Sequence, residues 1–150
     1  MMNLKSVIIF FFVILAFSGC KKKEESWVYC VDCELVEWVG NFEGTGEYYN
    51  DNPPITEYDV PVHISIENIS GTQLKTTVKA GDKIQETFTT SKNDNNYYYT
   101  VPGSDKSLSL NLSKRSSDFK LTGTVKKYRS KSDSIIVDKS ISFVVYKQKD

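Results

Sequence analysis

The chain has one histidine among its 150 residues, and its 19 basic residues are balanced by 19 acidic ones. A catalytic Ser-His-Asp or Cys-His arrangement would depend on His63 alone. That residue stands between Val62 and Ile64, where period-two alternation predicts a ring that faces solvent. The sequence has no glycine-rich phosphate-binding motif and no metal-ligand spacing. Its zero net charge gives no overall attraction for the negatively charged backbone of a nucleic acid. We therefore expect a protein that is not an enzyme and has no catalytic residues, metal, cofactor or nucleic-acid partner.

Long hydrophobic runs are also scarce. The longest is VIIFFFVILAF at residues 7–17, which would measure about 16 Å as a helix, against about 30 Å of hydrocarbon in a bilayer. It is too short to be a permanent membrane helix. Lys5 precedes it, and the small residues Ser18 and Gly19 follow it. A positive start, a short apolar segment and a small-residue site are typical of a secretory signal peptide.

The tripeptide Ser18-Gly19-Cys20 resembles the lipobox of bacterial lipoproteins, in which an aliphatic residue and two small residues precede the cysteine; here Phe17 takes the aliphatic place. The resemblance implies that residues 1–19 are a signal peptide and that the mature chain begins at Cys20. It also implies a diacylglycerol and an N-acyl chain such as palmitate on Cys20, which together hold a protein stably on a membrane. The alternative is ordinary secretion, with Cys20 present by coincidence.

The residues after Cys20 bear on its destination. Lys21-Lys22-Lys23-Glu24-Glu25 resembles the lysine-then-acidic signal that sends lipoproteins of one Gram-negative phylum to the cell surface. A solvated tether that carries no signal is the alternative. An aspartate directly after the cysteine would have indicated the inner membrane, but Lys21 stands there. We therefore expect a lipid anchor in the outer membrane, on either its periplasmic or its cell-surface face.

Besides Cys20 the chain has only two cysteines, Cys30 and Cys33. In an oxidising envelope compartment two spare thiols tend to pair, so we expect a disulfide between them. So small a loop contributes about 2 kcal/mol to stability. A redox CxxC motif is one alternative, but that chemistry works at a helix N-terminus in a βαβ unit, and nothing downstream has that pattern. A zinc site is another, and it would need two more ligands.

From residue 36 onward apolar and polar residues alternate, which is typical of half-buried strands. Turn-forming clusters leave only short gaps, so consecutive strands should be antiparallel neighbours. After a tether at residues 20–35, we expect one all-β domain at residues 36–150, a small eight-stranded antiparallel up-and-down barrel. A two-layer β-sandwich is the alternative, because alternation does not report closure. The inward positions include Trp38 and Phe42, Val62 and Ile64, Leu74 and Val78, Ile84 and Phe88, Tyr97 and Tyr99, Leu108 and Leu110, Phe119 and Leu121, and Ile141 and Phe143.

The segment EWVGNFEGTGEYY at residues 37–49 places a tryptophan before alternating glycines at the start of the strands. This pattern resembles bacterial lipocalin-like domains, although Val36 stands where their Gly-x-Trp signature has glycine. The resemblance implies a lipocalin-like barrel for residues 36–150. Function does not follow from such a fold alone.

An eight-stranded barrel can fill with side chains or hold one small guest. We expect first that it binds a small apolar or amphipathic ligand.

Glu86 stands on the apolar face, where a carboxylate needs a charged or polar partner, a raised pKa or access to water. In a ligand-binding barrel it could fix the polar end of a guest. A bulge or a position near the open rim is the alternative explanation for Glu86. The expected ligand-binding residues are Trp38, Phe42, Glu86, Phe88, Tyr97, Tyr99, Phe119 and Phe143.

The alternative function is a protein–protein interaction module with a filled barrel, acting as an assembly accessory, a hydrolase inhibitor or a surface factor. Polar loops at residues 50–55, 91–96 and 130–134 would then contact another envelope protein. Tyr98, which alternation places outside the barrel, could add a contact beside one of these loops. The bulky inward aromatics are compatible with either function.

Overall fold

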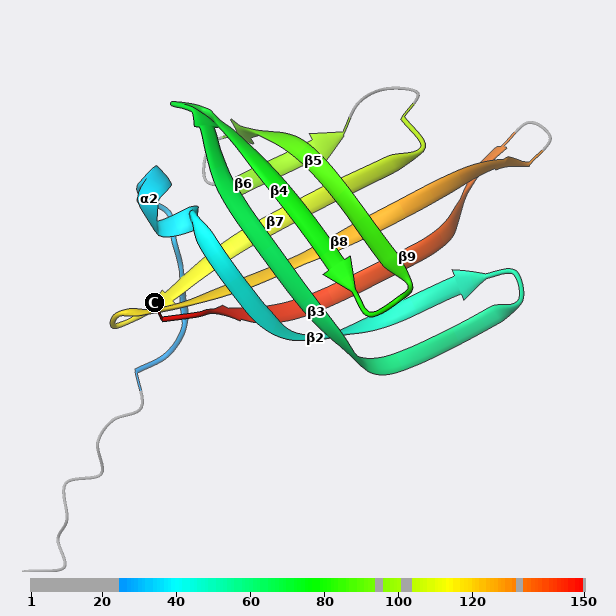
Figure 1. Ribbon diagram of the computed structural model, residues 1–150, viewed down its shortest axis with the longest axis horizontal. Helices are drawn as coiled ribbons and strands as arrows, with labels where there is room; N and C mark the ends of the chain where they lie inside the picture. Colours follow the sequence, from blue (N-terminus) through cyan, green and yellow to red (C-terminus); the bar gives the residue numbers. More distant parts are fainter. Residues whose placement is uncertain (1–24, 94–95, 101–103, 132–133, 150) are drawn as a thin grey trace, which may run out of the picture.

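The computed structural model describes residues 25–93, 96–100, 104–131 and 134–149, and gives the side chains of these except residues 91–93, 96–100 and 131. Figure 1 shows an almost entirely β-structure with one helical turn, α2 (Leu35–Trp38), which follows the short strand β1 (Val28–Tyr29). The longer strands coincide with the eight that alternation predicts. They are β2 (Gly40–Asp51), β3 (Pro54–Ser70), β4 (Gln73–Ala80), β5 (Ile84–Asn93), β6 (Asn96–Thr100), β7 (Lys106–Arg115), β8 (Asp118–Lys131) and β9 (Ser134–Lys147).

Strands β2 to β9 pair in a closed antiparallel ring. Each strand is hydrogen-bonded to the next in sequence order, and β9 returns to pair with β2 from Phe42↔Lys147 to Asn50↔Lys139. The chain therefore forms the small up-and-down barrel that the sequence predicts, and not the sandwich. Closure leaves few free sheet edges, which would otherwise invite pairing with other chains.

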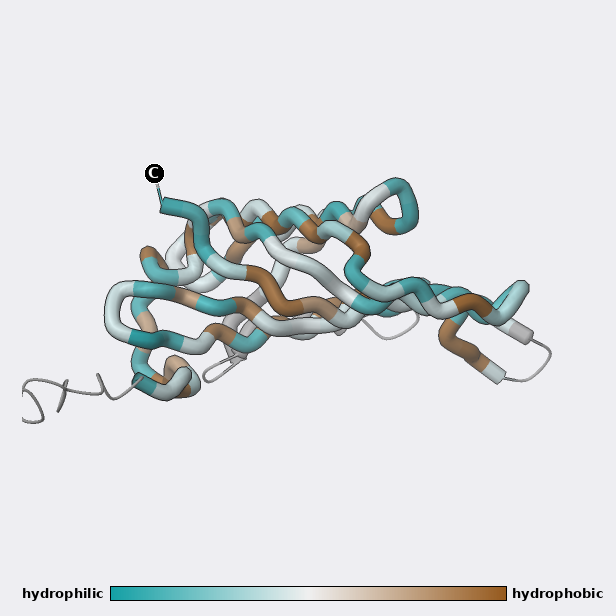
Figure 2. Tube along the Cα trace, turned by 90° about the horizontal axis from the view of Figure 1, so that it is seen from below, coloured by the Kyte–Doolittle hydropathy of each residue, from teal (hydrophilic) through white to brown (hydrophobic). Residues whose placement is uncertain are grey.

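The inward face of the ring is apolar. Along β4 the residues Leu74, Thr76, Val78 and Ala80 are buried, and each residue between them is exposed or half-buried. Figure 2 shows the same change between hydrophobic and hydrophilic positions along the strands. Burial of apolar surface, at about 25 cal/mol per Å², is the main term that favours this closed arrangement.

Two glycines lie where neighbouring strands come too close for a side chain. A Cβ on Gly44 would lie 2.3 Å from the carbonyl oxygen of Val144 on β9. A Cβ on Gly123 would lie 2.3 Å from the carbonyl oxygen of Ser109 on β7 and 2.7 Å from the ring of Phe143. These close approaches let β2 and β8 curl enough to close a ring of few strands.

The turn α2 covers the end of the barrel where β2 begins. Glu34 and Glu37 form a capping box at its start, and Trp38 at its end is 2% exposed. The sequence places Trp38 on the first strand, and this is wrong, because the chain is helical up to that residue and the strand begins at Gly40. The tryptophan nevertheless points into the core, since the helical turn lays its indole over the end of the barrel.

The segment before α2 extends the barrel wall. Val28 and Tyr29 pair with β7 at Lys114 and Ser113, beyond the residues of β7 that pair with β6. The ring of Trp27 lies 4.5 Å from the guanidinium of Arg115, measured to the ring centroid. The chain from Trp27 onward, which lies within the expected tether at residues 20–35, is thus packed on the barrel.

Two long hairpins continue past the end of the other strands. Strand β4 pairs with β3 only from Val62 onward, and β7 pairs with β8 only up to Lys127. Beyond those points the hairpins β2–β3 and β8–β9 extend together, and β2 and β9 remain paired only as far as Asn50↔Lys139. These two hairpins, at the end opposite α2 in Figure 1, are here called the hairpin arm (residues 48–57, 128–131 and 134–139). The register shifts between Gly46 and Tyr48 and between Lys127 and Tyr128 mark its base, since bulges bend strands.

Candidate functional site

Most of the aromatic side chains predicted to surround a ligand pack against one another and the rest of the core. Trp38, Phe42, Phe88 and Phe143 are 2%, 0%, 1% and 3% exposed, and all four belong to one cluster of buried residues. A side chain that lined a space large enough for a guest would keep accessible surface on that side. The packing around these four residues therefore favours the filled barrel.

The remaining three aromatics of the predicted ligand site stand apart from this group. Phe119 is half-buried against the core, with the Nζ atom of Lys147 5.4 Å from its ring centroid. The side chains of Tyr97 and Tyr99, and that of the predicted contact residue Tyr98, lie outside the described residues. The backbone of β6 places Tyr99 opposite the buried Leu108.

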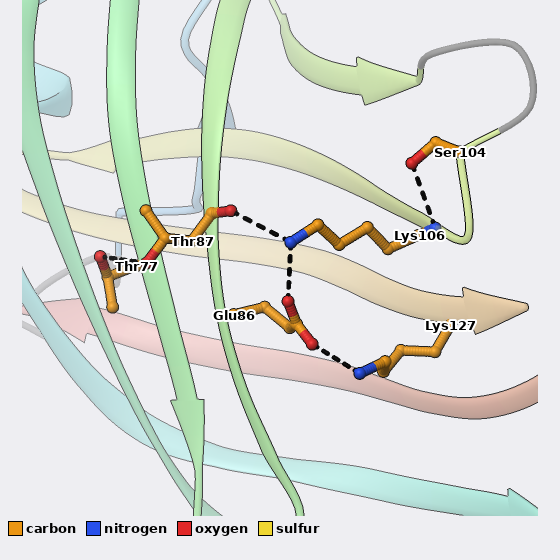
Figure 3. Close-up of polar contacts among 6 residues, drawn as sticks. All are labelled: Thr77, Glu86, Thr87, Ser104, Lys106 and Lys127. Carbon is orange, nitrogen blue, oxygen red and sulfur yellow. Dashed lines mark hydrogen bonds and ion pairs between the residues drawn. The ribbon is translucent and has the colours of Figure 1, made fainter.

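Glu86 projects from β5 between two lysines, as Figure 3 shows. Its Oε2 accepts a hydrogen bond from the Nζ of Lys106 at 2.7 Å, and its Oε1 accepts one from the Nζ of Lys127 at 2.6 Å. The side chain of Glu86 is 15% exposed, against 25% for Lys106 and 37% for Lys127. Both carboxylate oxygens thus have a cationic partner, which is one of the three outcomes that the sequence allows for an inward glutamate.

The charge states of this cluster support each other. Burial raises the pKa of the Glu86 carboxyl, but the hydrogen bonds and charges of Lys106 and Lys127 outweigh it and hold the pKa below its ordinary value of 4.5. The hydrogen bond to Glu86 in turn raises the pKa of Lys127 above 10.5, against the smaller opposing effect of burial. At neutral pH Glu86 is therefore a carboxylate and Lys127 an ammonium.

The cluster of Glu86, Lys106 and Lys127 lies beside a stretch of β5 that, among the described residues, has a partner strand on one side only. Residues 84–90 of β5 pair with β4, whereas β6 joins β5 only at residues 91–93. The Nζ of Lys106 lies 3.4 Å from the carbonyl oxygen of Thr87 and donates to it where a strand would supply a backbone amide. Lys106 also lies 5.1 Å from the ring centroid of Phe88. The arrangement ties β5 to β7 and β8, which is a structural role for Glu86.

The other residues singled out by the sequence lie on the surface or in a disulfide. His63 faces solvent as predicted, with its side chain 57% exposed and its Nδ1 3.3 Å from the Oε1 of Glu43. Cys30 and Cys33 form the predicted disulfide, with their Cα atoms 5.2 Å apart and both residues 6% exposed. Glu37 lies beside them, but sulfur atoms joined to each other are not thiolate ligands for zinc.

The hairpin arm holds the second ionic cluster. Arg129 on β8 pairs through Nη2 with the Oδ2 of Asp51 on β2 at 2.5 Å, and through Nε with the Oδ1 of Asp138 on β9 at 2.9 Å. Three strands of the arm are thereby joined at one side chain. Ile55 and Ile135, near the tips of the two hairpins, are 44% and 70% exposed. The arm is thus held together by the ion pairs of Arg129 and exposes apolar side chains to solvent.

Three hollows open on the outer surface of the described residues. One of about 570 Å³ lies beside the N-terminal segment, lined in part by Tyr29 and Arg115. One of about 520 Å³ lies over the barrel wall near Gly123, and one of about 440 Å³ lies at the base of the arm beside Tyr48. Among the buried aromatics Tyr48 borders the hollow at the arm and Phe143 the one over the barrel wall, whereas Trp38, Phe42 and Phe88 border none of the three. The hollows are therefore features of the surface.

Comparisons with known protein families, with curated proteins and with solved structures find no match for this chain. Among the described residues no helix is long and apolar enough to cross a membrane. The site must accordingly be interpreted from its own geometry.

Two features could not be predicted from the sequence: the two lysine partners of Glu86 and the hairpin arm. Lys106 and Lys127 stand 20 and 41 residues from Glu86, and both read as ordinary polar positions near strand ends. The available signal was the inward position of Glu86 itself, since a buried carboxylate requires a cation. The arm gave no signal, because alternation continues along β2, β3, β8 and β9 whether or not β4 and β7 lie beside them.

Proposed function

We propose that this chain is a lipid-anchored protein of the outer membrane whose filled barrel presents the hairpin arm to another envelope protein. The anchor is Cys20, as its lipobox-like surroundings imply, and the chain is not an enzyme. The observation that carries the proposal is the packing of Trp38, Phe42 and Phe88, which are at most 2% exposed. With the interior occupied by side chains, recognition falls to the outer surface.

The hairpin arm is the part of that surface best suited to a protein partner. It extends beyond the barrel, and its two tips each carry an exposed isoleucine, Ile55 and Ile135. Tyr58 at its base is 71% exposed. Apolar and aromatic side chains on a supported surface are typical anchors of protein interfaces. The ion pairs of Arg129 keep the arm in one shape, which lowers the entropy lost on binding.

A small apolar or amphipathic ligand is the second candidate. A closed ring of eight strands is just wide enough for one such guest, and this supports it. A guest would have to displace side chains such as Phe42 or Phe88 from the core. The two candidates therefore differ in whether the core must open.

Site-specific photo-crosslinking in intact membranes tests the proposal. A photoreactive residue is placed at Ile55 or at Ile135, and a matched control replaces Ile69, which is 52% exposed on β3 at the far end from the arm. The expected result is one polypeptide crosslinked from both arm positions and absent from the control. The same crosslinks from all three positions, or none from the arm, would contradict the assignment of the partner surface to the arm.

A further inference from the structure

A group of exposed apolar side chains lies at the end of the barrel opposite the arm. Val28, Tyr29, Val31 and Val36 are 61%, 71%, 64% and 68% exposed, and we call them the anchor-side patch. Single exposed apolar residues are normal, but four large ones within residues 28–36 form a concentrated feature. The proposed contact surface on the arm does not use them.

The fold holds the anchor-side patch outward. Cys30 and Cys33 are both buried and joined, so Val31 between them is directed to the surface. The amide of Cys30 donates to the carbonyl of Leu112 on β7 at 3.0 Å, which fixes the segment to the barrel wall. These contacts hold the segment that carries Val28, Tyr29 and Val31 against the barrel wall with Val31 on the outer side.

Basic and aromatic residues border the patch. The ring centroid of Trp27 lies 4.5 Å from the guanidinium carbon of Arg115 and 4.8 Å from the Nζ of Lys120. The neighbouring hollow of about 570 Å³ is lined by Val28 and Tyr29 together with Lys114, Arg115, Glu25 and Asp32. Aliphatic side chains beside Trp, Tyr, Lys and Arg are typical of surfaces that rest in the headgroup region of a bilayer.

The length of chain before the patch decides what covers it. The seven residue steps from Cys20 to Trp27 span at most about 25 Å. A lipid anchor on Cys20 therefore keeps Val28 and Tyr29 within about that distance of the bilayer, at a high effective concentration toward it. The membrane is then the surface that the patch meets most often.

We propose that the anchor-side patch docks on the headgroup region of the membrane that holds Cys20, with the hairpin arm directed away from it. This inference rests on the lipid anchor of the proposed function and adds an orientation to it. The lipid supplies attachment, and the patch sets which end of the barrel faces the bilayer. Because β1 and the arm lie at opposite ends of the barrel, docking leaves Ile55 and Ile135 free for a partner (Figure 1).

The test uses the acylated protein, purified from its membrane and reconstituted in phosphatidylethanolamine and phosphatidylglycerol vesicles with brominated acyl chains, which quench nearby tryptophan. Tyr29→Trp reports on the patch. Tyr58→Trp is the matched control, since both tyrosines are 71% exposed and Tyr58 lies by the arm. The signal is the fluorescence added over that of the two natural tryptophans. We expect the added fluorescence to be largely quenched in Tyr29→Trp and unquenched in Tyr58→Trp.

A third variant separates docking from mere proximity. This variant combines three substitutions, Val28→Ser, Val31→Ser and Val36→Ser, in the Tyr29→Trp background. They remove the apolar surface but keep the tether, so the quenching of the tryptophan at position 29 should fall toward that of the tryptophan at position 58. Equal quenching in Tyr29→Trp and Tyr58→Trp, or none in Tyr29→Trp while Cys20 is acylated, would overturn the docking and leave the anchor standing. An intact mass without acyl chains on Cys20 would overturn both.

Discussion

Glu86 on β5 and Lys127 on β8 lie 41 residues apart in sequence, yet the Nζ of Lys127 donates to the Oε1 of Glu86 at 2.6 Å. Lys106 on β7 occupies the other carboxylate oxygen at 2.7 Å. The carboxylate at the predicted ligand site thus already has two charged partners from the chain itself. Its geometry indicates a polar connection between β5 and the paired strands β7 and β8, with which β5 forms no backbone ladder in the described residues.

Replacing Glu86 with glutamine should destabilise the protein by about 1–3 kcal/mol, because the amide nitrogen cannot accept from a lysine and the negative charge that both ammonium groups face is lost. Urea unfolding measures the change. Glu67→Gln is the control, since its pair with Lys75 is 60% and 46% exposed and should contribute less than about 1 kcal/mol. Equal losses in the two variants would contradict a special role for the cluster.

The cluster should also make stability depend on pH at both extremes. The folded pKa of Glu86 lies below 4.5, so its stabilisation is present above that pH and is lost as pH falls through the folded pKa. The folded pKa of Lys127 lies above 10.5, so its stabilisation is present below that pH and is lost as pH rises through the folded value. Urea midpoints of the wild type and Glu86→Gln should therefore converge in acid and in strong base. A constant difference across the whole range would contradict this assignment.

Gly44→Ala should be strongly destabilising, by about 1–3 kcal/mol or more, since the new Cβ would lie 2.3 Å from the carbonyl oxygen of Val144. Gly71→Ala is the control, because a Cβ there meets nothing within 4 Å. Thermal unfolding of both variants measures the contrast. Similar melting temperatures for the two variants would show that β2 does not approach β9 as closely as described.

Arg129→Met should loosen the arm and leave the barrel intact. The guanidinium joins Asp51 and Asp138, so its loss should speed amide hydrogen exchange in residues 48–57 and 134–139. Global unfolding should change by less than about 1 kcal/mol, because the pairs are partly exposed. Lys75→Met, which removes an exposed pair on the barrel wall, is the control. Unchanged exchange in the arm would mean that its backbone ladder alone supports it.

Much of this fold could be predicted from the sequence, because half-buried strands record their inner and outer faces in alternate residues. Val62, Ile64 and Ile66 are 0%, 2% and 1% exposed, as their spacing indicates. The same spacing also continued back to Trp38 and assigned it to a strand, since a single helical turn is too short to show its own period. Local patterns fix which way a side chain points but not where a neighbouring strand ends.

The functional site was harder to predict, because it depends on contacts between distant strands. The inward glutamate was visible, whereas its lysine partners were not, since their positions depend on how β5, β7 and β8 meet. The aromatics supported a lined cavity and a filled barrel equally until their packing was known. Phe42 at 0% exposed and Phe88 at 1% favour the filled barrel.

Native mass spectrometry of the protein extracted from its own membrane, with Cys20 left as the cell made it, distinguishes a filled barrel that binds a protein from a barrel that holds a ligand. We expect a protein that begins at an acylated Cys20, carries no small guest and co-purifies with a polypeptide that Ile55→Ser and Ile135→Ser together release. A small extra mass that dissociates on activation, from a protein with no polypeptide partner, would contradict the filled barrel and favour a bound ligand.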